Sequence, residues 1–129
     1  MEKEKLTLFV LPERLAISHL DEKSSIPSWA TENVSFSCLA KTEDELSIVC
    51  PEDKVPGGIL AEKGWRALKV KGPLGFVMPG IVASLATPLA EAKISIFYIS
   101  TYETDYLLVK EENLDKTIKI LKSFCNIEE

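Results

Sequence analysis

The stretch ISIFYISTYETDYLLV, residues 94–109, decides the fold because it sets two β-patterned segments around a tight group of polar residues. The first segment carries apolar side chains at consecutive positions, which is typical of a strand that is covered on both faces. The second strand is expected from Tyr106 to Val109. Between them, residues 100–105 supply hydroxyl and carboxylate groups where the backbone changes direction, and such loops often carry ligand contacts. An ordinary hairpin connection is the alternative interpretation.

The length, amino-acid composition and net charge limit the kinds of protein that this chain can be. A chain of 129 residues with 46% hydrophobic and 27% charged residues is long enough for one domain, or for two small modules that share a core. The net charge of -5 gives no electrostatic reason to bind nucleic acid. Cys38, Cys50 and Cys125 are widely spread and form no CxxC motif, which favours reduced core thiols of a cytoplasmic protein. The apolar stretch from Leu6 stops at Pro12, too short for a membrane span, so no membrane contact is expected.

The first half of the chain is predicted to be mostly β. Two strands are expected around a turn at Pro12, then a short helix and a hairpin across residues 42–44. The loop at residues 53–58, DKVPGG, divides the chain into an N-terminal module, residues 1–60, and a C-terminal module, residues 61–129. The expected elements of the first half are Leu6–Leu11, Leu15–Leu20, the helix Ser25–Ala30, Val34–Ala40 and Leu46–Cys50.

The second half is predicted to have the order β-α-β-β-α. A strand from Trp65 to Val70 precedes a helix from about Ile81 to Ala92, and Asn113 can cap the last helix. This order indicates an α+β sandwich with an antiparallel sheet and helices on one face, in which an N-terminal strand completes the β-α-β-β-α-β unit. The inward positions are expected to be Ile81, Val82, Leu85 and Leu89 in the first helix, and Leu114, Ile118, Leu121 and Phe124 in the last.

With this order, the segment GIVASLATPLAEAKISIFYISTYETDYLLVKEENL, residues 80–114, resembles an ACT domain, and within that family the CASTOR-type proteins that sense arginine. The resemblance implies a ferredoxin-like sandwich of two ACT-like modules that share strands, the first of them degenerate. It also implies binding of an amino acid at an interface between modules or between subunits of a homodimer, without catalysis and without a cofactor or metal.

The resemblance also implies contacts for individual residues. Asp105 matches the acid that meets a basic group of the ligand, and Thr101 and Tyr102 match residues that line the same pocket. Gly75 matches a close backbone approach, and Met78 stands where the arginine sensors carry a second acid, which argues for a neutral or aliphatic amino acid. The remaining matches are Ser95 and Ile96, which would contact the ligand from the opposite module.

Elementary chemistry agrees with part of this assignment. A free amino acid needs N–H donors for its carboxylate and an acid for its ammonium group. The helix that begins near Gly80 offers the donors, and Asp105 offers the acid. The alternatives are a turn-forming role for Asp105, β preference for the threonines and packing for Tyr102. The full candidate set is Gly75, Met78, Gly80, Ile81, Val82, Ser95, Ile96, Thr101, Tyr102, Thr104 and Asp105.

The candidate residues leave three alternative functions to consider. The first is a regulatory module that binds an amino acid and signals to a protein partner. The second is an ACT-fold interaction or dimerisation module without a ligand, in which Met78 and Tyr102 fill the pocket. The third is a small enzyme, which is not expected because His19 is the only histidine and no base, nucleophile and orienting group converge.

Overall fold

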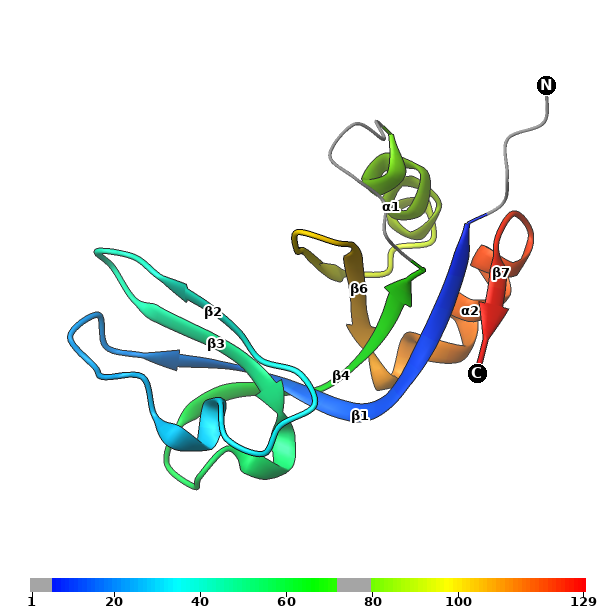
Figure 1. The fold of residues 1–129 in the computed structure, drawn as a ribbon. Coiled ribbons are helices and arrows are strands. Elements are labelled where there is room, and N and C mark those ends of the chain that lie inside the picture. Colours follow the sequence, from blue (N-terminus) through cyan, green and yellow to red (C-terminus); the bar gives the residue numbers. More distant parts are fainter. Residues whose placement is uncertain (1–5, 72–79) are drawn as a thin grey trace. The chain divides into compact units, whose positions relative to one another are not determined.

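The structure, a computed structural model, describes residues 6–71 and 80–129 (Figure 1). It divides into two compact units, one made of residues up to Pro12 together with Arg66–Glu129, and the other of Glu13–Trp65. The strands β1 and β4 each pass from one unit into the other. The elements are β1 (Thr7–Leu20), β2 (Cys38–Lys41), β3 (Leu46–Pro51), β4 (Leu60–Val70), α1 (Ile81–Glu91), β5 (Ile96–Ser100), β6 (Asp105–Lys110), α2 (Leu114–Lys122) and β7 (Asn126–Glu128), with 3-10 turns at Ser28–Ala30, Glu52–Lys54 and Glu111–Asn113.

The strand β1 runs without a break through Pro12, so the predicted turn at that residue is wrong. Residues Thr7–Phe9 pair in parallel with β7, and Leu15–Leu20 pair antiparallel with β3. Pro12 is exposed and lies between these two paired runs, where neither β7 nor β3 needs an N–H group from it. A proline therefore fits within this long strand.

In the unit Glu13–Trp65, β3 lies between β2 and the second part of β1. The predicted hairpin is confirmed, although β2 begins at Cys38, later than expected. Its turn is held by the Thr42 hydroxyl, whose oxygen accepts hydrogen bonds from the backbone N–H groups of Asp44 and Glu45, each at 3.1 Å. The predicted helix is only a 3-10 turn at Ser28–Ala30 with Pro27 in the cap position, and Ser25 does not cap it.

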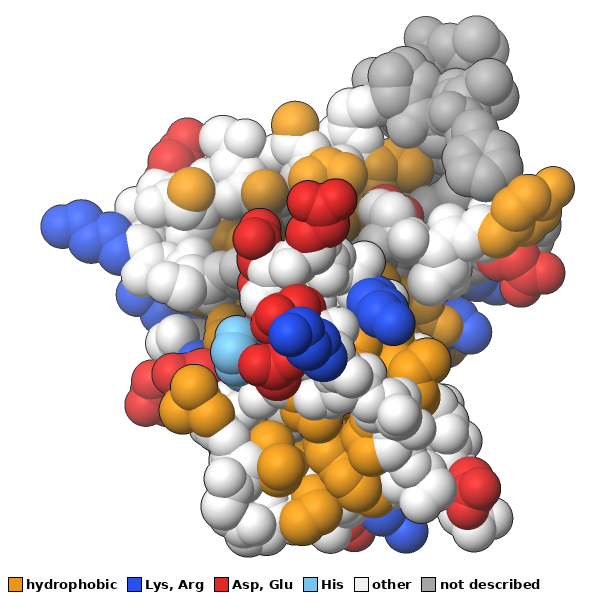
Figure 2. Space-filling model, turned by 90° about the vertical axis from the view of Figure 1, so that its left-hand side faces the viewer, with side chains coloured by type: hydrophobic (Ala, Val, Ile, Leu, Met, Phe, Trp, Pro, Cys, Tyr) orange, Lys and Arg blue, Asp and Glu red, His pale blue; other side chains and the backbone are white. Residues whose placement is uncertain are grey.

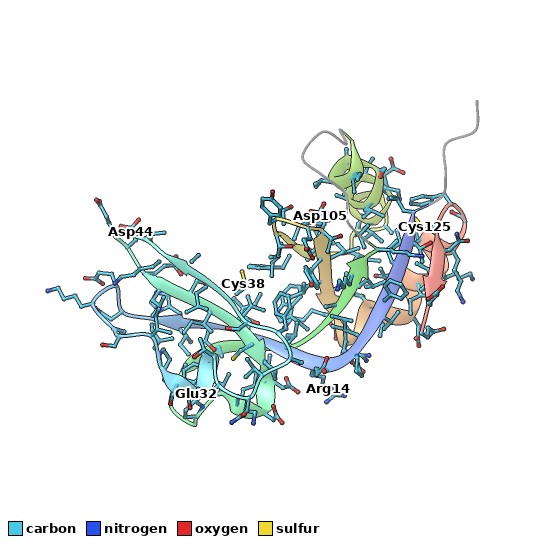
Figure 3. The ribbon with its side chains drawn as sticks, in the orientation of Figure 1. Arg14, Glu32, Cys38, Asp44, Asp105 and Cys125 are labelled. Carbon is cyan, nitrogen blue, oxygen red and sulfur yellow. The ribbon has the colours of Figure 1, made fainter. Side chains whose placement is uncertain are left out.

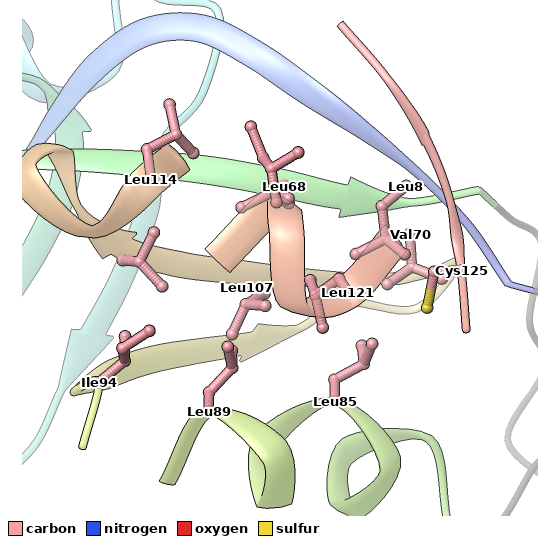
Figure 4. Packing of buried hydrophobic residues seen from close by; sticks show 12 residues of the cluster. Leu8, Leu68, Val70, Leu85, Leu89, Ile94, Leu107, Leu114, Leu121 and Cys125 are labelled. Atoms are coloured by element: carbon pink, nitrogen blue, oxygen red, sulfur yellow. The ribbon is translucent and has the colours of Figure 1, made fainter. Parts of the chain in front are cut away.

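In the other unit, β4 lies between β1 and β6, and β5 pairs with β6 at the end of this order. The predicted β-α-β-β-α succession is confirmed, and an N-terminal strand does complete the sheet. The short strand β7, which the sequence pattern did not predict, pairs with β1. Buried side chains of β4 and β6 pack against Leu85 and Leu89 of α1 and Leu121 of α2, so both helices cover one face of this sheet (Figure 4).

The predicted inward faces of the helices are mostly confirmed. In α1, Leu85 and Leu89 are fully buried, whereas Val82 is 45% exposed and was wrongly placed in the buried stripe. In α2, Leu114, Ile118 and Leu121 are buried, and Phe124, beyond the end of the helix, packs against the same cluster. Asn113 occupies the N-cap position of α2, but its side chain makes no capping hydrogen bond.

The surface carries charges of both signs. On the face shown in Figure 2, acidic and basic side chains lie among one another and no continuous basic area is visible. No helix within residues 6–71 and 80–129 is long and apolar enough to cross a membrane.

Candidate functional site

The connection between β5 and β6 is a four-residue turn closed by its two threonines. The strand register pairs Ser100 with Asp105, so residues 101–104 form the loop. The backbone N–H of Thr101 donates to the Thr104 carbonyl at 2.8 Å, and the Thr101 hydroxyl donates to the same carbonyl at 2.9 Å. The Thr101 hydroxyl thus stabilises the turn, although the residue itself is exposed.

Thr104 fixes this turn to the neighbouring strand. Its side chain is buried, with 4% of the residue exposed, and its hydroxyl donates to the carbonyl of Val70 at the end of β4. Because β4 ends at Val70, the turn is held beside the point where the chain leaves the sheet towards α1. The role of Thr104 in this structure is positional.

Asp105 and Tyr98 form a hydrogen-bonded pair on one face of the hairpin. Since Ser100 is opposite Asp105, Tyr98 is its diagonal neighbour two residues away, within reach of a long side chain. The Tyr98 hydroxyl donates to Oδ2 of Asp105 at 2.8 Å. The other carboxylate oxygen, Oδ1, has no hydrogen-bond partner among the residues that the structure describes, and Asp105 is half-buried at the end of the sheet nearest α1 (Figure 3).

The environment of Tyr98 keeps its hydroxyl protonated. Burial of the ring raises the pKa of Tyr98 well above its ordinary value, and the hydrogen bond to the Asp105 carboxylate raises it further. Tyr98 is therefore a hydrogen-bond donor to Asp105 throughout the physiological pH range. Tyr98 was not among the residues predicted to form the site; the signal for it is the strand alternation that puts Tyr98 and Asp105 on the same face.

The helix α1 begins at Gly80, whose φ of 85° is in the left-handed region that favours glycine. Among the residues that the structure describes, no side chain caps the helix, so none of them takes up the N–H groups of its first turn, which begins with Ile81 and Val82. The positive end of the helix dipole adds to their attraction for an anion. Gly75 and Met78 lie outside the described residues.

The remaining candidates do not converge on this turn within one chain. Ser95 is exposed and Ile96 is the first residue of β5, paired with Val109 at the opposite end of the hairpin from Asp105. At about 3.3 Å per residue, Ile96 is roughly 13 Å from Ser100 along the strand. Tyr102, at the tip of the turn, is 80% exposed, which rules out burial in the core as its role in this structure.

Other potentially reactive groups are scattered. Cys38, Cys50 and Cys125 are free thiols, and burial raises the pKa of the Cys38 and Cys50 thiols, which disfavours their thiolate forms. Within the described ranges, no group of three or more histidine, cysteine, aspartate or glutamate side chains could hold a metal ion. A surface depression of about 270 Å³ in the unit Glu13–Trp65 is lined by Glu13, Arg14, Pro51, Glu52 and Asp53.

Comparison with known proteins identifies the family. The ACT domain family model matches residues 60–123, and a model of an N-terminal domain matches residues 13–58. The subunit 1 of the cytosolic arginine sensor for mTORC1 is 36% identical over 100 residues in Bos taurus and 37% identical over 98 residues in Homo sapiens. The chain belongs to the ACT domain family. The alignments cover 71% and 70% of this ACT protein but only 30% of each sensor, so the chain spans about a third of the length of these relatives.

Solved structures show the same ACT fold. A protein from Agobacterium tumefaciens superimposes with a TM-score of 0.88 and 35% identity, over 98% of this chain and 96% of that one. The aspartate kinase of Clostridium acetobutylicum, an allosteric enzyme, matches with a TM-score of 0.66 and 15% identity, over 88% of this chain and 33% of the kinase. The second likeness shows the fold alone. Together they confirm the predicted ferredoxin-like α+β sandwich.

Proposed function

We propose that this ACT protein is a non-enzymatic regulatory module that binds a free amino acid at the β5–β6 turn. The observation that carries the proposal is the half-buried Asp105 carboxylate, which Tyr98 holds by one oxygen while the other has no partner among the described residues. A carboxylate in that state accepts a hydrogen bond from an ammonium group at little cost in rearrangement. The similarity to proteins named as arginine sensors supports the same class of ligand.

The two charges of an amino acid match two features of this unit. The N-terminus of α1, which no side chain in the described part of the chain caps, suits the carboxylate, and Asp105 suits the ammonium group. Thr104 holds the turn to the end of β4, which limits movement of Asp105 before a ligand arrives. Such preorganisation reduces the entropy lost on binding.

The site is completed, in this proposal, by a second copy of the chain. The strand β5 is the last in the order β1-β4-β6-β5, and its sequence IFYIS carries no charge that would oppose pairing with another strand. Antiparallel pairing of two β5 strands about a twofold axis puts the start of one strand beside the end of the other. Ser95 and Ile96 of one copy would then lie near the turn and Asp105 of its partner.

A thermal-shift screen of the twenty free amino acids at millimolar concentration tests the proposal. A ligand at 100 times its Kd stabilises the native state by about 2.7 kcal/mol, which is a rise of several degrees in Tm for a chain of this size. Asp105→Asn is expected to abolish the shift. Glu103→Gln is the matched control, because it removes an exposed acid from the same turn and should leave the shift intact.

Light scattering with and without the active amino acid tests the second copy. A dimer that Ser95→Arg disrupts, together with loss of the thermal shift, is the expected result. If no amino acid shifts the Tm of the wild type, the proposed function is wrong, and an interaction module without a ligand becomes the better explanation. The exposure of Val82 at 45% and Tyr102 at 80% is the observation that favours this second candidate.

A further inference from the structure

We infer that the two strands that join the units, β1 and β4, form a hinge, and that the Glu52 carboxylate is a latch that stiffens it. The unit boundaries fall at Pro12–Glu13 in β1 and at Trp65–Arg66 in β4. All of these residues lie outside the β5–β6 turn, so the inference does not depend on the proposed function.

Each strand departs from a regular ladder close to its boundary. Pro12 has no N–H group, so β1 cannot donate a hydrogen bond to a neighbouring strand at that residue, and bending there breaks no bond of that kind. Gly64 lies within β4 with a φ of 82°, in the left-handed region, which interrupts the pleat as a β-bulge does. Hinges typically consist of a few such residues, which absorb the change in backbone angles.

On one side of the boundary, β1 is fixed by Arg66. Its Nη2 donates to the Leu11 carbonyl at 3.0 Å, and its Nη1 donates to both carboxylate oxygens of Glu111, at 3.3 and 3.1 Å. Only 16% of the Arg66 side chain is exposed, so this contact is well shielded from water. The last residue of β1 before Pro12 is therefore held within its own unit.

On the other side, β4 is fixed by Glu52. Its Oε2 accepts a hydrogen bond from the backbone N–H of Gly64 at 2.9 Å, and its Oε1 lies 3.9 Å from Nη1 of Arg14. A hydrogen bond to a carboxylate changes an equilibrium by about tenfold or more. The ion pair contributes little, because Arg14 is 58% exposed. The bond to Gly64 is thus the main part of the latch.

The latch is open to solvent. Glu52 is 23% exposed and lines the depression of about 270 Å³, so its carboxylate can exchange the Gly64 N–H for water without entering the core. Opening therefore leaves both units folded. Rotation is then confined to the residues between the contacts of Arg66 and Glu52, which are Pro12–Glu13 and Gly64–Trp65.

Residual dipolar couplings of the full chain in a weakly aligning medium test this inference when they are fitted separately for each unit. In the wild type the two alignment tensors are expected to be equal in magnitude, because a latched hinge aligns both units as one body. In Glu52→Ala they should differ, because a unit that reorients averages its couplings, and the Gly64 amide should lose about tenfold in protection from hydrogen exchange. Asp53→Ala is the matched control: it removes an exposed acid from the same 3-10 turn and should change neither result.

Equal tensors in a folded Glu52→Ala protein would overturn the inference, and so would unequal tensors in the wild type. Gly64→Ala is the second variant. Among the described residues, a Cβ at this position meets no atom within 4 Å, but alanine disfavours a φ of 82°. Its N–H group should therefore turn away from Glu52 and the tensors should again become unequal. If Glu52→Ala does not fold, this variant decides by the same criterion.

Discussion

The hydrogen bond between Tyr98 and Asp105 should be measurable as a coupling free energy in the absence of ligand. The perturbations are Tyr98→Phe, Asp105→Ala and the double variant. A hydrogen bond to a charged group contributes about 1.5–3 kcal/mol net, and because both partners are only half-buried, water compensates for part of its loss. We expect a coupling free energy of about 1–2 kcal/mol.

Urea unfolding of the four proteins, followed by circular dichroism, gives the free energies of unfolding from which this coupling is calculated. Pairing Tyr106→Phe with Asp105→Ala provides the control, since the Tyr106 side chain is on the other face of β6 and the two effects should add. Independent sites add within about 0.3–0.5 kcal/mol. A Tyr98–Asp105 coupling no larger than that would refute the argument that the tyrosine orients the carboxylate.

Three further predictions concern the same unit. The pKa of Tyr98 is raised in the folded protein, so above about pH 10 the tyrosine ionises in the unfolded state while it stays protonated in the folded state. The free energy of unfolding of the wild type should therefore fall by up to about 1.4 kcal/mol per pH unit relative to that of Tyr98→Phe. Identical pH dependence of urea unfolding for the two proteins up to about pH 11 would contradict this. Thr104→Val removes the buried hydroxyl that donates to Val70 and should cost about 1–3 kcal/mol in urea unfolding, whereas an exposed threonine of α1 replaced in the same way should cost less than about 1 kcal/mol. Leu85→Ala, at a fully buried position, should cost about 2–5 kcal/mol, and a cost as small as that of Val82→Ala on the exposed side of the same helix would contradict the packing.

The elements predicted correctly are those whose pattern of apolar or β-favouring residues is complete within one segment of the chain. The helix α1 and the β5–β6 pair are of this kind, because a buried stripe or a run of β-favouring residues depends on neighbours along the chain. Pro12 shows the limit of such reasoning. Whether a proline ends a strand depends on which neighbouring strand would need its N–H group, and one of those neighbours, β7, is only three residues long and about 115 residues away in sequence.

In the candidate site, too, the residue types could be predicted from the local sequence, whereas their hydrogen-bond partners depend on residues elsewhere in the fold. Residue types alone pointed to Thr101, Thr104 and Asp105, since hydroxyls and an acid at a turn are visible in the sequence. The partners of these groups were not predictable in the same way. Thr104 donates to a carbonyl 34 residues earlier in the chain, and the pairing of Tyr98 with Asp105 follows only from the exact register of the hairpin.

This register limits what similarity to a relative can establish about the turn. An acid at a matching position shows that a carboxylate is present, but it does not show which side chains contact that carboxylate. In this chain the Tyr98 hydroxyl donates to one oxygen of Asp105, and it does so because Tyr98 lies diagonally opposite Asp105 in the hairpin. A shift of the register by one residue would place Tyr98 on the other face of the sheet and remove this hydrogen bond without any change in the acid itself.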